Sequence, residues 1–406
     1  MRVLLSTYGS RGDVEPMLAL AVRLRALGAD ARLCAPPDFA GLAVGLGVSF
    51  VPVGRPVRPM VTGTTPPSAK GLPERAAEWV SAQFETVIAA AEGCDVVVGG
   101  GMMPVAERSA AERLGVRHVY VTFQQITLPS PFRAPLARAG RAFPPEVTDN
   151  RALWELDAKD IGELFGPTLN DHRASLGMSI VDDVRDHVYT DTPWLATDPT
   201  LDPWRETSDV DVVQTGAWIL DDDPPLPSEL EEFLDAGAPP VYVGFGSMAA
   251  HAPGLRSPED VARAVIEAIR ARGRRVVVGR GWADLALIDD EPDCFAVGEV
   301  NQQALFRRTA AVVHHGGAGT TMTATRSGAP QVVVPQAVDQ PYWAGRVAEL
   351  GIGVAHDGSV PTAESLSAAL ETALTPATRE RATTVAAAIR ADGATVAANL
   401  LLDRSA

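Results

Sequence analysis

The chain has 406 residues, more than one ordinary hydrophobic core holds, so two domains are expected. Hydrophobic residues make up 46% of the sequence and charged residues 21%, which is typical of a folded protein and excludes a disordered one. The formal net charge of -16 disfavours a nucleic-acid partner, because affinity for nucleic acid comes from neutralising phosphates.

Cysteine content and hydropathy indicate the compartment. Cys34, Cys94 and Cys294 form no C-x-x-C pair, which predicts reduced thiols in a cytoplasmic protein. The apolar run at the N-terminus breaks at Gly9, too early for a signal peptide, and no other segment approaches membrane-spanning length. We therefore expect a cytoplasmic protein with no stable membrane insertion.

The first half of the chain alternates between strand and helix patterns. Residues 2–6 predict a strand, residues 9–12 a glycine turn, and the apolar stripe that follows predicts a helix beginning near Pro16 and ending at Gly28. Strands alternating with helices predict a parallel, doubly wound sheet. The later predicted strands are 31–34, 48–53, 95–98 and 118–122, and the helices between them are 39–46, 74–92 and 104–114.

The pattern weakens after Phe123 and returns in the second half. Few clean strands are predicted between residues 123 and 207, where the main feature is a polar helix near 153–176. The acidic, proline-bearing segment 214–226 predicts a linker, and Asp221–Asp223 within it is interpreted as linker rather than as a metal triplet. Afterwards come strands at 241–247, 275–278, 294–297, 311–314 and 331–334, a helix at 260–272, and a last helical run at 380–402.

Two α/β halves in one chain predict two doubly wound, Rossmann-like domains that face each other across a cleft. The expected division is an N-terminal domain (1–207), a linker (208–226) and a C-terminal domain (227–406). The final helical run either closes the second half or crosses back onto the first. Ligands in such sheets bind outside the carboxyl ends of the strands, so the loops there are the candidates for function.

The stretch His314–Thr321 (HHGGAGTT) carries the strongest signal. Its glycines follow a strand and precede a helix, which lets a diphosphate approach unpaired N–H groups at the positive end of the helix dipole. His315 and the two threonines add donors. The alternative is a glycine-rich corner that binds nothing. The turn at Gly9–Gly12 lacks the G-x-G-x-x-G spacing and no G-x-x-x-x-G-K-[ST] is present, which disfavours simple NAD or ATP chemistry.

Other loops at strand ends carry weaker signals. Asp339 and Gln340 suit the recognition of sugar hydroxyls, although Asp339 also suits a helix cap before Pro341. Three further residues have both a functional and an ordinary interpretation: Ser247 as a phosphate donor or a helix cap, Trp282 as a stacking ring or wall packing, and Val300 in a loop that pairs with a pyrimidine or binds nothing.

Asp13 is the carboxylate nearest the first glycine turn. It is either a general base for an acceptor hydroxyl or an N-cap for the helix that begins near Pro16.

These motifs together resemble a known family. The chain is similar to GT-B fold natural-product glycosyltransferases, most closely the glycopeptide-antibiotic (vancomycin-group) glycosyltransferases. The similarity runs nearly end to end, whereas residues 55–72 and 123–143, which shape the acceptor pocket in this family, match no member closely. The matching stretches are 1–37, 213–220, 241–247, 280–284, 298–301, 314–321, 335–347 and 354–358.

The resemblance implies an inverting transfer of glucose or a deoxysugar from a dTDP- or UDP-sugar to a hydroxyl of an antibiotic aglycone, with a glycopeptide favoured. No metal or other cofactor is expected. The alternatives are a polyketide or other lipophilic aglycone as acceptor, a nucleotide-sugar epimerase, or an auxiliary protein without activity. The resemblance makes 1–207 the acceptor-binding domain and 227–406 the nucleotide-sugar-binding domain. The implied roles are Asp13 as general base; Arg11 and Gly12 in the first-domain turn that closes over the donor; Ser247, His315, Gly317, Gly319, Thr320 and Thr321 at the diphosphate; Trp282 and Val300 at the nucleobase; Asp339 and Gln340 at the sugar; and Phe123, Gln124 and Gln125 at the acceptor.

Overall fold

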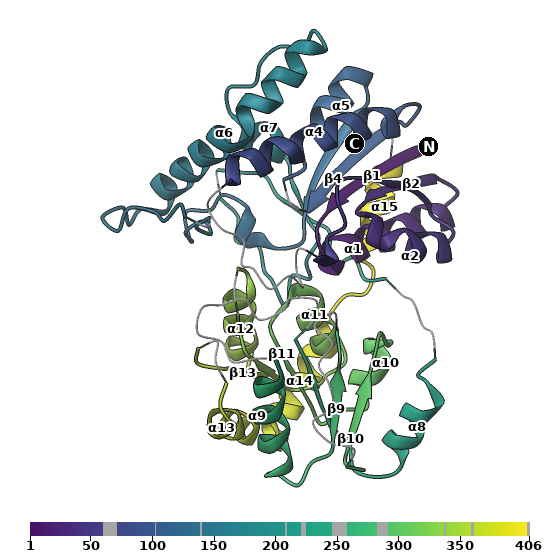
Figure 1. Ribbon diagram of the computed structural model, residues 1–406, viewed down its shortest axis with the longest axis vertical. Helices are drawn as coiled ribbons and strands as arrows, with labels where there is room; N and C mark the ends of the chain where they lie inside the picture. The colour runs from purple at the N-terminus through teal and green to yellow at the C-terminus, as the bar shows by residue number, and fades with distance from the viewer. Residues whose placement is uncertain are drawn as a thin grey trace. The chain divides into compact units, whose positions relative to one another are not determined.

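The computed structural model describes residues 1–59, 71–101, 103–138, 140–207, 209–220, 225–245, 258–281, 291–336, 338–358 and 361–403. The chain divides into two compact units. The first comprises Met1–Val57, Pro67–Leu220 and Arg390–Ala406, and the second comprises Arg58–Pro66 and Asp221–Ile389. Each unit is built on its own parallel sheet with helices packed on it (Figure 1).

The sheet of the first unit has the order β3-β2-β1-β4-β5-β6-β7, with all neighbouring strands parallel. Val3, Leu4 and Leu5 of β1 are fully buried, as expected for a strand covered on both faces. The strand order changes direction between β1 and β4, so the loops after these two strands flank the switch point, where such sheets bind ligands. The strands are β1 (Arg2–Tyr8), β2 (Asp30–Ala35), β3 (Ser49–Pro52), β4 (Val96–Gly101), β5 (Arg117–Thr122), β6 (Trp194–Leu195) and β7 (Val213–Gln214).

The helices of the first unit cover this sheet (Figure 1). They are α1 (Arg11–Ala26), α2 (Ala40–Gly45), α4 (Leu72–Ala91), α5 (Glu107–Leu114), α6 (Asn150–Ser175), α7 (Val184–Tyr189) and α15 (Gly393–Leu402), with short 3-10 turns η1 (Pro37–Phe39) and η2 (Gln125–Thr127).

The sheet of the second unit has the order β10-β9-β8-β11-β12-β13, again all parallel. Its switch point lies between β8 and β11. The strands are β8 (Val241–Gly244), β9 (Val276–Gly279), β10 (Cys294–Val297), β11 (Ala311–His314), β12 (Gln331–Val333) and β13 (Gly353–Ala355). The helices are α8 (Ser228–Asp235), α9 (Pro258–Arg270), α10 (Gln302–Phe306), α11 (Ala318–Arg326), α12 (Gln340–Glu349), α13 (Ala363–Ala373) and α14 (Pro376–Ala388).

The two parallel, doubly wound sheets confirm the predicted fold class, and most predicted strands match within two residues. Residues 213–214 differ, because they form β7 in the first sheet instead of part of a linker. The predicted run 380–402 also differs, because it is two helices. α14 ends at Ala388 in the second unit, and α15 begins at Gly393 in the first.

Specific contacts hold α15 in the first unit, where it lies against α1 (Figure 1). The backbone N–H of Arg390 donates to Asp198 Oδ2 at 2.8 Å, and Arg117 donates to the Leu400 carbonyl at 3.4 Å. A Cβ on Gly393 would lie 2.4 Å from the Ala217 carbonyl oxygen, so only glycine allows this close approach.

The C-terminal segment also bears on the membrane prediction. By length and composition, Pro376–Leu402 is apolar enough to cross a membrane, with a hydropathy of 1.4. The expectation that no segment approaches spanning length therefore fails for this one. In the structure, however, the helical segment is interrupted between Ala388 and Gly393, and its two helices belong to different units.

Candidate functional site

The glycine loop after β11 stands at the switch point of the second sheet. β11 ends at His314 and α11 begins at Ala318, which confirms the predicted strand–turn–helix. Gly317 occupies the N-cap position and has no side chain that could cap the helix. The N–H groups of the first turn of α11 therefore remain available to an anion, and the helix dipole favours negative charge there.

Two glycines of this loop are sterically required. Gly316 has φ +93°, and a Cβ there would lie 2.7 Å from Val333 Cγ1 and 3.1 Å from the Gln340 carbonyl oxygen. A Cβ on Gly317 would lie 2.6 Å from His315 Nε2. The loop therefore packs tightly against the end of β12 and the start of α12. Gly319 is exposed, with open space where a Cβ would stand.

His314 holds the glycine loop in place from the end of β11. It is fully buried, its Nδ1 accepts from the Gly316 N–H at 3.1 Å, and its Nε2 contacts Gln331 Oε1 at 3.0 Å. The Gln331 amide donates in turn to Thr325 Oγ1 at 2.9 Å. Burial lowers the pKa of His314 to about 3, so the ring stays neutral and Nδ1 can accept. The sequence did not reveal this supporting role, which only its distant partner Gln331 makes visible.

His315 presents an unsatisfied nitrogen. Its side chain is 8% exposed, and its Nδ1 has no hydrogen-bond partner among the residues described. Burial lowers the pKa of His315 to about 4, while a hydrogen bond to the Gly244 backbone opposes that shift. A buried polar atom without a partner costs free energy, so this nitrogen beside the start of α11 is a candidate ligand-binding group.

The two threonines of the loop differ in their surroundings. Thr321 is fully buried, and its hydroxyl donates to the Gly317 carbonyl at 2.9 Å. Its hydroxyl hydrogen is therefore already used to hold the first turn. Thr320 is half-buried in the same turn.

The loop between β12 and α12 lies beside the glycine loop, because β11 and β12 are neighbouring parallel strands. Asp339 stands at the N-cap position of α12, but its side chain makes no capping hydrogen bond. Instead its Oδ2 accepts from the indole N–H of Trp343 at 2.8 Å. Gln340 is buried, and its Oε1 accepts from the Gln336 N–H at 2.7 Å. Asp339 thus occupies the N-cap position, but its side chain bonds to Trp343 and not to the backbone N–H groups of α12.

Other predicted donor residues lie elsewhere in the second unit. Val300 is partly buried and packs against the core cluster that includes Leu305 and Phe306. The next residue, Asn301, caps α10 by accepting from the Ala304 N–H at 3.1 Å. Ser247, Trp282 and the Asp221–Asp223 triplet lie outside the described residues.

In the first unit, Asp13 belongs to the turn after β1. The Ser10 N–H donates to Asp13 Oδ2 at 2.9 Å, so Asp13 is the third helical residue of a capping box. α1 therefore begins at Arg11, five residues before the predicted start, with Pro16 inside it. A Cβ on Gly9 would lie 2.0 Å from Asp13 Oδ2, so the glycine makes room for the carboxylate. Asp13 therefore does take part in capping, but as the third residue of the helix, and Ser10 is the N-cap residue.

The other two residues of this turn that were predicted to bind the sugar donor, Arg11 and Gly12, are on α1. Arg11 pairs with Glu15 through its Nε at 2.7 Å, with both side chains 37% exposed. Gly12 is exposed. An exposed ion pair of this type contributes little to stability, so Arg11 can exchange its partner at low cost.

The acceptor candidates after β5 are largely engaged within the first unit. Phe123 is half-buried and makes an edge contact with Trp218 at 6.0 Å between ring centroids. The Gln124 carbonyl accepts from the Thr127 hydroxyl at 2.9 Å. Gln125 is buried, and its amide bonds Asp202 and Arg133. Gln125 therefore shapes this loop through an amide that is already hydrogen-bonded.

Glu107 at the first switch point was missed by the sequence analysis. It is 2% exposed, its Oε1 accepts from the Ser6 hydroxyl at 2.7 Å, and its Oε2 has no partner among the residues described. Burial raises the pKa of Glu107 to about 7, against smaller opposing effects of the Ser6 hydroxyl and backbone N–H groups. A glutamate in the first turn of a helix is ordinarily expected to be exposed, and nothing in the neighbouring sequence indicates that Glu107 is buried.

We expect Glu107 to make the stability of the first unit depend on pH. Its folded pKa is above its ordinary value of 4.5, so its contribution is complete below about 4.5 and is lost as pH rises through about 7. The free energy of unfolding falls by about 3 kcal/mol over this pH range. Thermal unfolding of Glu107→Gln from pH 5 to 8 should lack this dependence, and the exposed Glu155→Gln should keep it. An identical pH dependence in Glu107→Gln and the native protein would refute the assignment.

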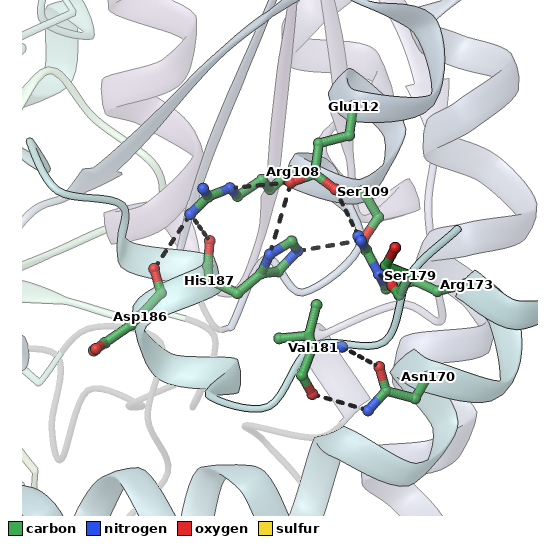
Figure 2. Close-up of polar contacts among 9 residues, drawn as sticks. All are labelled: Arg108, Ser109, Glu112, Asn170, Arg173, Ser179, Val181, Asp186 and His187. Carbon is green, nitrogen blue, oxygen red and sulfur yellow. Dashed lines mark hydrogen bonds and ion pairs between the residues drawn. The ribbon is translucent and has the colours of Figure 1, made fainter. Parts of the chain in front are cut away.

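A Ser–His–carboxylate cluster in the first unit has the residue types of a nucleophilic triad (Figure 2). His187 Nε2 lies 3.3 Å from Ser109 Oγ, and its Nδ1 lies 3.9 Å from Glu112 Oε1. Ser109 is fully buried, however, and its Oγ accepts from Arg173 at 2.8 Å, so no substrate reaches it. Arg173 also pairs with Glu112 at 2.7 Å. The cluster therefore joins α5, α6 and α7 and has no catalytic access.

Comparisons with known proteins find family models that match parts of both units of the chain. Residues 3–125 match the model of the glycosyltransferase family 28 N-terminal domain, and residues 269–399 match that of the erythromycin biosynthesis protein CIII-like, C-terminal domain. The chain is 56% identical to glycosyltransferase GtfE of Amycolatopsis orientalis over 99% of this chain and 97% of the relative.

Two further relatives come from the same organism. The vancomycin aglycone glucosyltransferase is 54% identical, over 99% of this chain and 97% of its own length. The dTDP-epi-vancosaminyltransferase is 52% identical, over 95% and 93%. Among solved structures, the glycotransferase of kitacinnamycin has a TM-score of 0.72 at 21% identity, covering 99% of this chain and 98% of that one, and so shares the fold.

Proposed function

The chain belongs to the vancomycin-group glycosyltransferases, and we propose that it transfers glucose or a deoxysugar from a dTDP- or UDP-sugar to a hydroxyl of a glycopeptide aglycone. The observation that carries the donor assignment is His315 Nδ1, which has no partner among the described residues and lies beside the start of α11 at the switch point. The acceptor assignment draws on the relative named as a vancomycin aglycone glucosyltransferase. We propose a cytoplasmic location, where nucleotide sugars are made.

On the donor side, the diphosphate is bound by the first N–H groups of α11, with His315 and Thr320 beside them. Gly317 and Gly319 let phosphate oxygens approach the backbone. In the adjacent loop, the carboxylate of Asp339 accepts from hydroxyls of the donor sugar. Ser247, Trp282 and Val300 keep the diphosphate and base roles that the family resemblance implies.

The chemistry we propose is inverting, direct displacement. Asp13 accepts the proton of the acceptor hydroxyl as its oxygen bonds to the anomeric carbon, and the bond from that carbon to the diphosphate oxygen breaks. The helix dipole and N–H groups of α11 stabilise the charge on the departing nucleoside diphosphate. Neutralisation by the backbone and His315 requires no metal.

A transfer assay tests this proposal. The purified protein is incubated with dTDP- and UDP-glucose, and with a dTDP-deoxysugar, against a panel of glycopeptide and polyketide aglycones, with products identified by mass spectrometry. We expect a singly glycosylated glycopeptide aglycone. Transfer to a polyketide alone would replace the acceptor assignment, and isomerisation of the donor without acceptor would identify an epimerase instead. If no pair of donor and acceptor gives a transfer product or an isomerised donor, the proposal is contradicted.

A further inference from the structure

Trp343 makes a contact with the donor loop that the assigned roles do not explain. Its side chain is 1% exposed within α12, and its indole N–H donates to Asp339 Oδ2 at 2.8 Å, one helical turn away. Tyr342 packs on it edge-on, with 5.2 Å between the ring centroids. The indole is therefore a fixed donor aimed from the core at a half-buried carboxylate.

The backbone before Asp339 is held in an unusual conformation. Val338 has φ +57° and is 61% exposed, and a β-branched residue rarely adopts this left-handed region. Such strained positions persist only where the surrounding structure enforces them, and they gather at ligand sites. Gln340 closes the loop from the other side by accepting from the Gln336 N–H. The loop is thus set before any ligand arrives.

We propose that Trp343 is a positioning residue for the donor sugar, acting through the carboxylate of Asp339. The indole N–H holds Oδ2, which fixes the plane of the carboxylate and directs Oδ1 to accept from a sugar hydroxyl. This inference rests on the proposed function, in which Asp339 binds the donor sugar. The same contact explains why Asp339 stands at an N-cap position without capping α12.

The indole hydrogen bond also favours the ionised form of Asp339. Burial raises the pKa of Asp339, while the hydrogen bond from Trp343 and a backbone N–H lower it, and no charged neighbour among the described residues contributes. Loss of the indole N–H therefore raises this pKa further. A protonated carboxyl has lost acceptor capacity, so sugar binding weakens as pH falls through the pKa.

The test compares Trp343→Phe, Asp339→Asn and the double variant. Trp343→Phe is expected to raise the donor KM about tenfold with a smaller change in kcat, and to move the acid limb of the donor kcat/KM profile to higher pH. Asp339→Asn removes that limb, because an amide does not titrate there. In the Asp339→Asn background, Trp343→Phe should change the donor KM less than twofold.

Controls separate positioning from packing. Trp154→Phe removes another buried indole N–H, one that donates to the Arg133 carbonyl at 2.9 Å, and should leave the acid limb in place. If Trp343→Phe fails to fold, benzothienylalanine at position 343 retains the ring shape without the N–H. Additive effects in the double variant, or an unmoved acid limb, would overturn the inference. An unchanged donor KM in Asp339→Asn would instead remove the sugar-binding role of Asp339 itself.

Discussion

Asp13→Asn is expected to lower kcat by about 10²–10⁴-fold, the usual contribution of a general base. An amide cannot take the proton of the acceptor hydroxyl, but its oxygen can still accept from the Ser10 N–H that Asp13 Oδ2 now binds at 2.9 Å. The start of α1 should therefore persist, and affinity for the nucleoside diphosphate should stay within about twofold, since binding and proton transfer use different residues. Single-turnover kinetics and calorimetry measure the two quantities.

A matched control is available on another helix of the same unit. Asp183 caps α7 by accepting from the Asp186 N–H at 2.9 Å, so it makes the same kind of bond outside the proposed site. Asp183→Asn should lower thermal stability about as much as Asp13→Asn, because both remove a charge from a helix start, and it should retain native turnover. Native turnover in Asp13→Asn would end the assignment of this residue as the base.

His315→Ala is expected to weaken nucleoside diphosphate binding about tenfold to a hundredfold, because a hydrogen bond to a charged group contributes about 1.5–3 kcal/mol. In the native protein the ring is neutral and hydrogen-bonded to the Gly244 backbone, and no described residue bonds to Nδ1. Binding a phosphate oxygen at Nδ1 then requires a proton there, so we expect proton uptake on binding. The pKa of about 4 rises when the anion binds, and affinity therefore increases as pH falls toward the pKa of the complex.

Calorimetry in two buffers of different ionisation enthalpy measures that uptake. His356→Ala is the control, because His356 is 7% exposed in the same unit, but its Nδ1 and Nε2 already lie 3.0 Å from the Gly358 carbonyl and 2.7 Å from the Ser365 hydroxyl. It should cost stability without changing diphosphate affinity. If His315→Ala binds as tightly as the native protein, His315 does not contact the diphosphate.

Local patterns were sufficient where the signal lies within one stretch of chain. The apolar run, the glycines and the helix start around His314–Thr321 predicted β11, its turn and α11, because strand periodicity and glycine turns are properties of neighbouring residues. The start of α1 was misplaced because Pro16 suggested a first turn, whereas the bond between Ser10 and Asp13 begins the helix at Arg11. That error came from weighing one local signal against another.

Distant contacts decided the rest. Glu107 is buried only because β1 and β4 bring Ser6 and Gly99 against it, and His314 holds the glycine loop only because Gln331 of the next strand faces it.

The sequence by itself thus determined the two parallel α/β sheets and the family, and it predicted the stretch at which we propose that an anion binds, because hydrophobic periodicity, glycine turns and motif spacing are local properties of the chain. Only the tertiary structure decided which of those polar groups are already satisfied. Thr321 and Gln125 have partners, whereas His315 Nδ1 has none among the described residues. Burial and pairing arise from segments far apart in sequence, and the pKa and the free hydrogen-bonding capacity of each group follow from them.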